Sequence, residues 1–241
     1  MSNLKRQDVR RIVAVLVVLA AAGWWVLASK DNWETEPIAE RSAAAAEVDS
    51  SAPLAVDVLA QLAVKGRAPK TGYAREEFYT NWPNIDGCDA RNVVLARDLT
   101  ETKLDKCLVL SGVLNDPYTG EVINFVRGPG TSSKVQIDHV VALSDAWQKG
   151  AQNLDKAERK SLAGDPLNLL AVDGPTNQAK GDSDAASWLP PNKAFRCQYV
   201  ARQISVKYKY SLWVTSAERD IMVQVLDKCP EERAVGVELA E

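Results

Sequence analysis

The sequence predicts an α+β fold, and three observations indicate this class. Two short apolar runs rich in β-branched residues, 134–141 and 167–172, are typical of buried strands. Two further apolar runs, 107–114 and 122–126, flank the turn-forming residues 115–120, which predicts a pair of antiparallel strands. Much of the remaining sequence has apolar residues spaced by three or four positions, as helices do.

The length and the charge balance bound the function. A chain of 241 residues with 46% hydrophobic residues is long enough for one well-filled core. The formal net charge is -3, but residues 67–229 contain 21 Lys and Arg against 20 Asp and Glu. A near-neutral domain offers no overall attraction to nucleic acid, so any nucleic-acid site must come from a local basic patch.

An uncharged apolar run occupies residues 12–28, directly after several basic residues. Its 17 residues suit a short membrane-spanning helix, which has roughly 17 to 25, better than a signal-peptide core of roughly 7 to 15. We therefore expect residues 1–29 to be a membrane anchor, with the domain outside the cytoplasm. Val26 and Ala28 have the small-residue spacing of a signal-peptidase site, so secretion after cleavage is the alternative.

The rest of the chain divides into a linker, one domain and a tail. Residues 30–53 are mainly Ala, Ser, Glu and Asp, which predicts a flexible linker. Residues 54–230 are predicted to form the domain, which opens with a short amphipathic helix and ends with a helix that the capping pair Thr215 and Glu218 begins. Residues 231–241 are expected to be a disordered tail.

Four cysteines lie beyond the membrane-targeting segment, so two disulfides are expected. Three pairings are possible. Proximity in the chain favours Cys88 with Cys107 and Cys197 with Cys229. No pair has the spacing of a zinc finger.

The clearest positive stretch is 192–210, which contains five basic residues and no acidic one. Its apolar residues fall on one helical face, so much of the basic set is expected to point outward. Such a face would suit a phosphate backbone, and Arg196 and Arg202 are candidate substrate-binding residues there. An ordinary solvated helix face is the alternative.

The polar residues that indicate chemistry lie between 135 and 180. Asp138 and His139, the chain's only histidine, come where the first predicted strand ends. Asn168 begins the second strand. Gly174-Pro175 then opens a helical turn that contains Asn177. The order is therefore strand, long excursion, strand, helix.

Three sequences in this region, Asp-His-Val-Val-Ala-Leu, Asp-Pro-Leu-Asn-Leu-Leu-Ala-Val and Asn-Gln-Ala-Lys-Gly-Asp, resemble the ββα-metal (HNH) nucleases. They look most like exported HNH-type domains related to the C-terminal part of GmrSD restriction enzymes. The resemblance covers about 73–229 and includes the element Gly-Cys-Asp-x-Arg-Asn at 87–92. It implies a ββα-metal core with added antiparallel strands and helices, so that 54–230 would be a nuclease domain.

The resemblance implies a division of roles. His139 would be the general base, since a neutral imidazole accepts a proton near pH 7. Asp138 and Asn177 would hold one Mg²⁺, or another divalent cation such as Mn²⁺. Asn168 would belong to the turn that orients His139 through a backbone carbonyl. HNH enzymes often have His at the last position, and Asn177 departs from that pattern.

Two more residues are candidates for binding the substrate. Lys180 lies one helical turn from Asn177 and is expected near a phosphate. Arg91 could clamp a phosphate with its guanidinium, or hold Asp86 or Asp89 in a loop.

Together these residues predict a metal-dependent endonuclease that acts outside the cytoplasm, on DNA rather than RNA. We expect a monomer without an organic cofactor. Two alternatives remain open: a non-catalytic cell-surface module that binds nucleic acid with the same fold, and another metal-dependent phosphoesterase.

Overall fold

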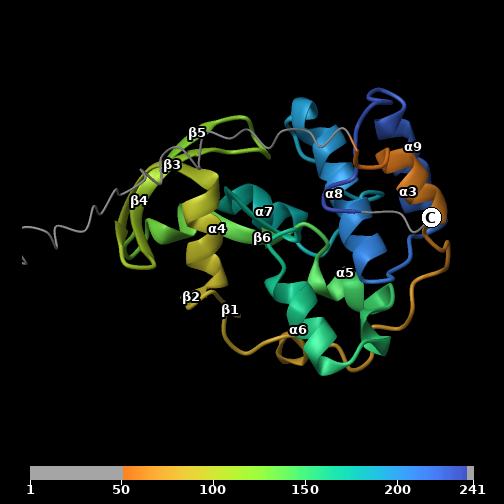
Figure 1. Ribbon diagram of the computed structural model, residues 1–241, viewed down its shortest axis with the longest axis horizontal. Helices are drawn as coiled ribbons and strands as arrows, with labels where there is room; N and C mark the ends of the chain where they lie inside the picture. Colours follow the sequence, from red (N-terminus) through yellow and green to blue (C-terminus); the bar gives the residue numbers. More distant parts are fainter. Residues whose placement is uncertain (1–50, 238–241) are drawn as a thin grey trace, which may run out of the picture. The chain divides into compact units, whose positions relative to one another are not determined.

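The computed structural model describes residues 51–237 and confirms an α+β fold (Figure 1). The α-helices are α3 (Ala55–Gln61), α4 (Ala90–Asp98), α5 (Leu143–Gln148), α6 (Lys156–Gly164), α7 (Gly174–Lys180), α8 (Arg196–Lys209) and α9 (Ser216–Leu226). The strands are β1 (Asn84–Ile85), β2 (Cys88–Asp89), β3 (Leu99–Asp105), β4 (Leu108–Asn115), β5 (Val122–Val126), β6 (Val135–His139) and β7 (Leu169–Asp173). Short 3₁₀ turns are η1 (Arg75–Glu77), η2 (Ser132–Lys134), η3 (Ala151–Asn153) and η4 (Lys193–Phe195).

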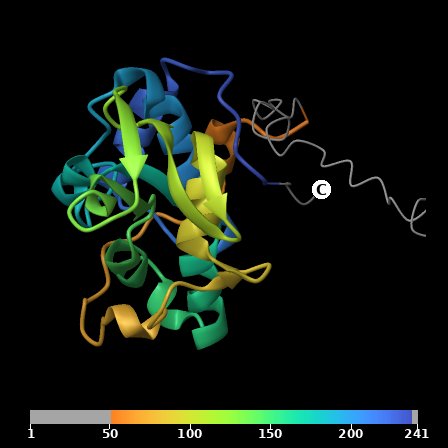
Figure 2. The ribbon, with the colours of Figure 1, turned by 90° about the vertical axis from the view of Figure 1, so that its left-hand side faces the viewer.

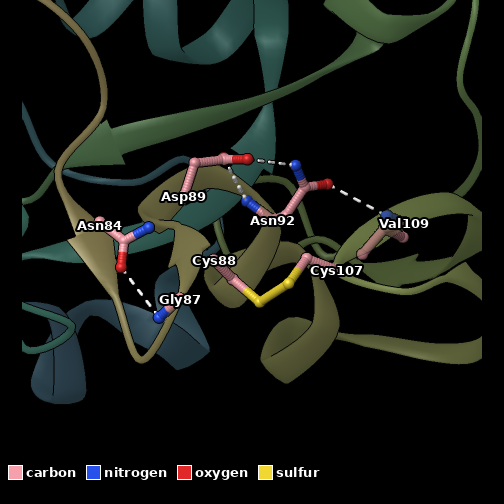
Figure 3. Close-up of a disulfide and its surroundings, with 7 residues drawn as sticks. All are labelled: Asn84, Gly87, Cys88, Asp89, Asn92, Cys107 and Val109. Carbon is pink, nitrogen blue, oxygen red and sulfur yellow. Dashed lines mark hydrogen bonds between the residues drawn. A yellow bond between two sulfur atoms is a disulfide. The ribbon is translucent and has the colours of Figure 1, made fainter.

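Strands β3, β4 and β5 form an antiparallel sheet in that order, which Figure 2 shows facing the viewer. The β4–β5 pair is the hairpin that the sequence predicts. Helix α4 covers this sheet, and Val94 and Leu95 of the helix join Phe125 of β5 in one buried apolar cluster. Asp89 caps α4 by accepting a hydrogen bond from the Asn92 backbone N–H, and the Cys88–Cys107 disulfide lies next to this cap (Figure 3).

Strands β6 and β7 form a separate antiparallel pair, in register from Val135 opposite Asp173 to His139 opposite Leu169. Helix α7 follows β7 at once, because Asp173 caps it and Pro175 fits its first turn. Only glycine suits position 174, since a Cβ there would overlap the Ser133 carbonyl oxygen. The strand, strand, helix order predicted from the sequence is therefore present.

Helices α3, α8 and α9 pack together around the largest apolar cluster, at the right of Figure 1. The Cys197–Cys229 disulfide ties the start of α8 to the residues after α9. Thr215 and Glu218 form the capping box that the sequence predicts for α9. Both disulfides are the pairing that proximity favours.

The described C-terminal residues, up to 237, differ from the disordered tail expected at 231–241. Ala234 and Val237 are buried in the α3–α8–α9 cluster. The Ala234 N–H donates to the Pro53 carbonyl, and the Ala55 N–H donates to the Glu232 carbonyl, each at 2.9 Å. Backbone pairing with the segment before α3 holds these residues in place.

A cluster of buried charges joins α5, α8, α9 and the loop after α7. Its buried members are the carboxylates Asp145, Asp184 and Glu218 and the cations Lys149 and Lys207, and the exposed Arg67 pairs with two of the carboxylates at its edge. Lys207 belongs to the basic stretch 192–210 and is fully buried, whereas Lys193 and Lys209 of the same stretch are exposed. Lys207 points inward because it forms ion pairs with Glu218 and Asp145, at 2.9 and 3.3 Å.

The predicted anchor, 1–29, and most of the predicted linker, 30–53, lie outside the described residues. Within 51–237, no helix is both long enough and apolar enough to cross a bilayer.

Candidate active site

His139 is the last residue of β6, and its ring is almost fully buried. The rings of Trp82 and Tyr79, from the segment before α4, stack with the imidazole at centroid distances of 5.9 and 6.0 Å. The planes of Trp82 and His139 differ by only 5°. The aromatic side chains therefore fix the plane of the imidazole.

One hydrogen bond sets the tautomer of His139. Its Nε2 lies 3.0 Å from the carbonyl oxygen of Ala163, and because a carbonyl can only accept, Nε2 carries the proton. Nδ1 is left as the basic nitrogen. Burial, together with the nearby positive charge of Arg75, lowers the pKa of His139 to about 3. The imidazole is therefore neutral at pH 7, and burial disfavours its protonated form.

The carbonyl that orients His139 corrects the expectation that the Asn168 turn provides it. Ala163 lies in the last turn of α6, where backbone carbonyls lack a partner within the helix and remain free to accept. The Asn168 side chain, fully buried, instead bonds both backbone groups of Val141 and donates to the Leu162 carbonyl. Asn168 thus connects the loop after His139 to the end of α6.

Asp138 lies behind His139 and is bonded through both carboxylate oxygens. Lys180 Nζ donates to Oδ1 at 2.9 Å, and the Tyr118 hydroxyl donates to Oδ2. Burial raises the pKa of Asp138, and the charge of Lys180 opposes that rise. Lys180 is itself buried and also donates to the His139 carbonyl. The sequence did not predict the contact between Tyr118 and Asp138, because Tyr118 lies in a predicted turn far from Asp138 in the chain.

Asn177 is half-buried on α7, and its Nδ2 donates to Oε1 of Gln136 at 3.0 Å. Asp138, His139 and Asn177 line one cavity of about 300 Å³, together with Asp182. Hydrogen bonds from Lys70 and Ser144 lower the pKa of Asp182, which keeps it ionised. The cavity thus brings together the predicted base and both predicted metal ligands.

The three predicted arginines do not line this cavity. Arg91 donates to the carbonyls of Ser132 and Val135, Arg196 to that of Pro190, and Arg202 to those of Leu167 and Pro166. Burial lowers the pKa of both Arg91 and Arg202. These guanidinium groups bind backbone within the domain, and the cavity gives no support to their predicted contact with substrate.

Comparison with known proteins identifies the family. Residues 89–225 match the family described as GmrSD restriction endonucleases, C-terminal domain. The chain belongs to this family. A relative from Arthroderma benhamiae, named as an uncharacterized secreted protein, is 40% identical over 183 residues, which cover 74% of this chain and 86% of the relative. No solved structure matches.

The match to the GmrSD C-terminal domain includes His139, Asn168, Asp138 and Asn177. Within 51–237, one group of His, Cys, Asp or Glu residues has donor atoms close enough for a shared metal, namely Cys197, Cys229 and Glu232. Both of its cysteines are in a disulfide, so they offer no thiolate ligand.

The donors of the cavity in this GmrSD-type domain suit a hard cation. Asp138, Asp182 and Asn177 offer carboxylate and amide oxygens, which Mg²⁺ and Mn²⁺ prefer over softer metals. Asp138 already accepts hydrogen bonds from Lys180 and Tyr118, which leaves it fewer lone pairs for a cation. The residues present therefore fit a divalent cation, with the ammonium of Lys180 as a competing positive charge.

Arg75 is a cavity residue that the sequence analysis missed. It begins η1, lines the cavity beside His139, and makes no ion pair with any residue in 51–237. Its guanidinium donates to the Tyr79 hydroxyl and lies 5.2 Å from the centre of the Tyr79 ring. No local sequence pattern distinguishes Arg75 from other arginines. Only the fold of the segment around η1 brings it close to His139.

Proposed function

We propose that this protein is a metal-dependent endonuclease that hydrolyses phosphodiester bonds of nucleic acid, DNA in preference to RNA, outside the cytoplasm. The main support is His139, a neutral imidazole of fixed tautomer that shares a cavity with the unpaired guanidinium of Arg75. A base and a cation in one cavity suit a reaction in which water attacks a phosphate.

In this proposal, Nδ1 of His139 takes the proton from the attacking water. The Ala163 carbonyl holds the opposite ring nitrogen, and Trp82 holds the ring plane, so the base needs no reorientation during the reaction. Arg75 binds a non-bridging oxygen of the scissile phosphate, since a guanidinium matches phosphate geometry. Asn168 acts as a positioning residue through the end of α6.

Asp138 and Asn177 would hold the divalent cation, Mg²⁺ or Mn²⁺, and Asp182 lies on the same cavity wall. When bound, such an ion neutralises the charge that develops on the phosphate and on the leaving oxygen. Lys180 orients Asp138 and its charge favours the ionised carboxylate against the effect of burial. A role for Lys180 near the phosphate remains a proposal.

A location outside the cytoplasm agrees with two findings. The domain contains two disulfides, which persist in oxidising compartments, and the A. benhamiae relative is named as secreted. We propose that residues 1–29 anchor the domain in the membrane, with release after signal cleavage as the alternative, and that the protein is a monomer.

The test is plasmid nicking by purified protein with Mg²⁺ and with EDTA, comparing wild type with His139→Ala. Loss of a general base typically costs about 10²- to 10⁴-fold, so the variant should fall by at least that range at saturating metal. Gln178→Ala, an exposed substitution on the wall of the same cavity, is the matched control and should remain near wild type.

Three outcomes would contradict all or part of the proposal. Nicking by His139→Ala within tenfold of wild type would remove His139 from the mechanism. DNA binding without any cleavage by wild type would favour a non-catalytic binding module. Activity confined to small phosphodiesters would favour another phosphoesterase.

A further inference from the structure

A second hollow lies beside the His139 cavity, and we call it the Trp82 groove. Its volume is about 440 Å³, and it is lined by Tyr79, Trp82, Lys156 and Lys160 among others. Sites for small organic ligands span roughly 300–1,000 Å³, so the groove can accommodate a group as large as a nucleoside. Tyr79 and Trp82 also stack with His139, so these two rings of the groove contact a residue that lines the cavity.

The charged residues that line the groove are two lysines and one carboxylate, that of Glu76, so its balance is positive. Lys156 and Lys160 lie one turn apart on α6, so their side chains share a face of the helix. Both are exposed, and neither forms an ion pair with any residue of 51–237. By contrast, Lys149, Lys180 and Lys207 are all buried against carboxylates. Two free ammonium groups at the edge of a groove favour an anionic ligand.

The aromatic side of the groove is held firmly. Tyr79 and Trp82 stack at 5.5 Å, and both rings are half-buried. Arg159 of α6 donates to the backbone carbonyl and the carboxylate of Glu77, which fastens the segment before Tyr79. Such rigid, partly exposed rings are a suitable platform for a planar base.

Helix α6 connects the groove to the proposed chemistry. Lys156 and Lys160 lie in its first two turns, and Ala163, which orients His139, lies in its last turn. A ligand held between these lysines and the Trp82 ring therefore lies at a fixed place relative to His139. The groove is therefore placed to bind the part of the substrate next to the bond that is cleaved.

We propose that the Trp82 groove binds one nucleotide adjacent to the scissile phosphate of a single-stranded nucleic acid. The base stacks on the Trp82 and Tyr79 rings, and its phosphate lies against Lys156 and Lys160. A base inside a duplex is already stacked on its neighbours, so this groove selects unpaired strands. The inference rests on the proposed function, whose substrate it narrows.

The charge component is tested by binding of a fluorescein-labelled ten-residue oligothymidylate to the full-length protein in EDTA, at several salt concentrations. The double variant Lys156→Gln, Lys160→Gln should bind more weakly. The slope of the logarithm of its binding constant against the logarithm of the salt concentration should also be smaller in magnitude by about 1.4. Each phosphate contact contributes about 0.7 to that slope for single strands, and two contacts are lost. The matched control is Lys103→Gln, Lys228→Gln, which removes two exposed lysines outside the groove and should match wild type.

The stacking component is tested by cleavage of single-stranded oligonucleotides with one abasic position, moved stepwise along the strand. Loss of one stacked base should lower kcat/KM about 5- to 150-fold when the abasic position flanks the cleaved bond. In Trp82→Leu, the kcat/KM for the intact substrate divided by the kcat/KM for the abasic substrate should fall toward one. That ratio is independent of any change in the overall rate of the variant.

The outcomes separate the groove from the nuclease proposal. Cleavage by wild type without any effect of the lysine variant or of abasic positions would overturn the groove and leave the nuclease proposal standing. Lysine-dependent binding without cleavage would support nucleotide binding in the groove, but it would overturn the nuclease proposal and with it the placement beside a scissile phosphate. A protein that neither binds nor cleaves the strand would overturn both.

Discussion

The ammonium of Lys180 lies 2.9 Å from Oδ1 of Asp138, and both side chains are buried. This pair links α7 to β6 directly behind the cavity. A buried charge that loses its partner is costly, whereas replacing both partners by neutral groups is often tolerated. Lys180 and Asp138 should therefore act as a unit in stability.

Lys180→Met should lower the free energy of unfolding by about 3 to 5 kcal/mol, because Asp138 is left buried and unpaired. Adding Asp138→Asn to this variant should restore part of the loss. Urea unfolding measures both effects, and Lys103→Met, at an exposed position, serves as the control. A Lys180→Met protein as stable as wild type would show that the pair has no net role.

His139 should make the metal-free protein sensitive to mild acid. Its pKa is about 3 in the folded state and about 6.5 when unfolded, so below pH 6.5 the unfolded chain binds a proton that the folded protein does not. Stability is therefore lost as the pH falls from about 6.5 toward 3, by up to about 1.4 kcal/mol for each unit.

His139→Asn cannot take up this proton and should lose less stability than wild type over the same range. Urea unfolding at pH 7, 5.5 and 4 in EDTA provides the comparison. Parallel pH curves for the two proteins would mean that the imidazole is not held neutral by the fold.

Glu218 forms ion pairs with both buried lysines, Lys149 and Lys207. Glu218→Gln should therefore destabilise the protein by about 3 to 5 kcal/mol, since two ammonium groups lose their shared carboxylate. Asp220→Asn, an exposed change on the same helix, should alter stability by no more than about 0.5 kcal/mol. Equal melting temperatures for the two variants would contradict a structural role for the charge cluster.

Reducing agent should lower the melting temperature markedly, because each disulfide contributes about 2 to 4 kcal/mol. The double variant Cys197→Ser, Cys229→Ser should show the loss expected of one bridge and a smaller response to reductant. Thiol counting on native protein should find no reactive cysteine. Detection of four reactive thiols in the native protein would contradict this prediction.

Local patterns predicted much of the fold. The turn between β4 and β5, the start of α7 at Gly174-Pro175, the capping box of α9 and the apolar runs of β6 and β7 depend on neighbouring residues, and all are present. Strand β3 was missed because most of its residues are polar and exposed, so that pairing with β4 alone defines it. Helix α4 was missed because its N-terminal cap, Asp89, resembles a turn residue.

The site was predictable only where its residues are neighbours in sequence. Asp138 and His139 stand together, and Asn177 follows from the helix after β7. The contacts that set their chemistry come from distant segments: Tyr118 reaches Asp138 from 20 residues away, and the Ala163 carbonyl reaches His139 from 24. No periodicity encodes such pairs, since tertiary packing creates them.

The hydrogen bonds between the segment before α3 and the residues after α9 also bear on how the chain can be rearranged. Pro53 pairs with Ala234, so a short peptide could join residue 237 to residue 51 without crossing the domain. New ends could then open at the exposed pair Pro129 and Gly130. A circular permutant of this kind should keep the His139 cavity, because no contact of that cavity depends on where the chain starts.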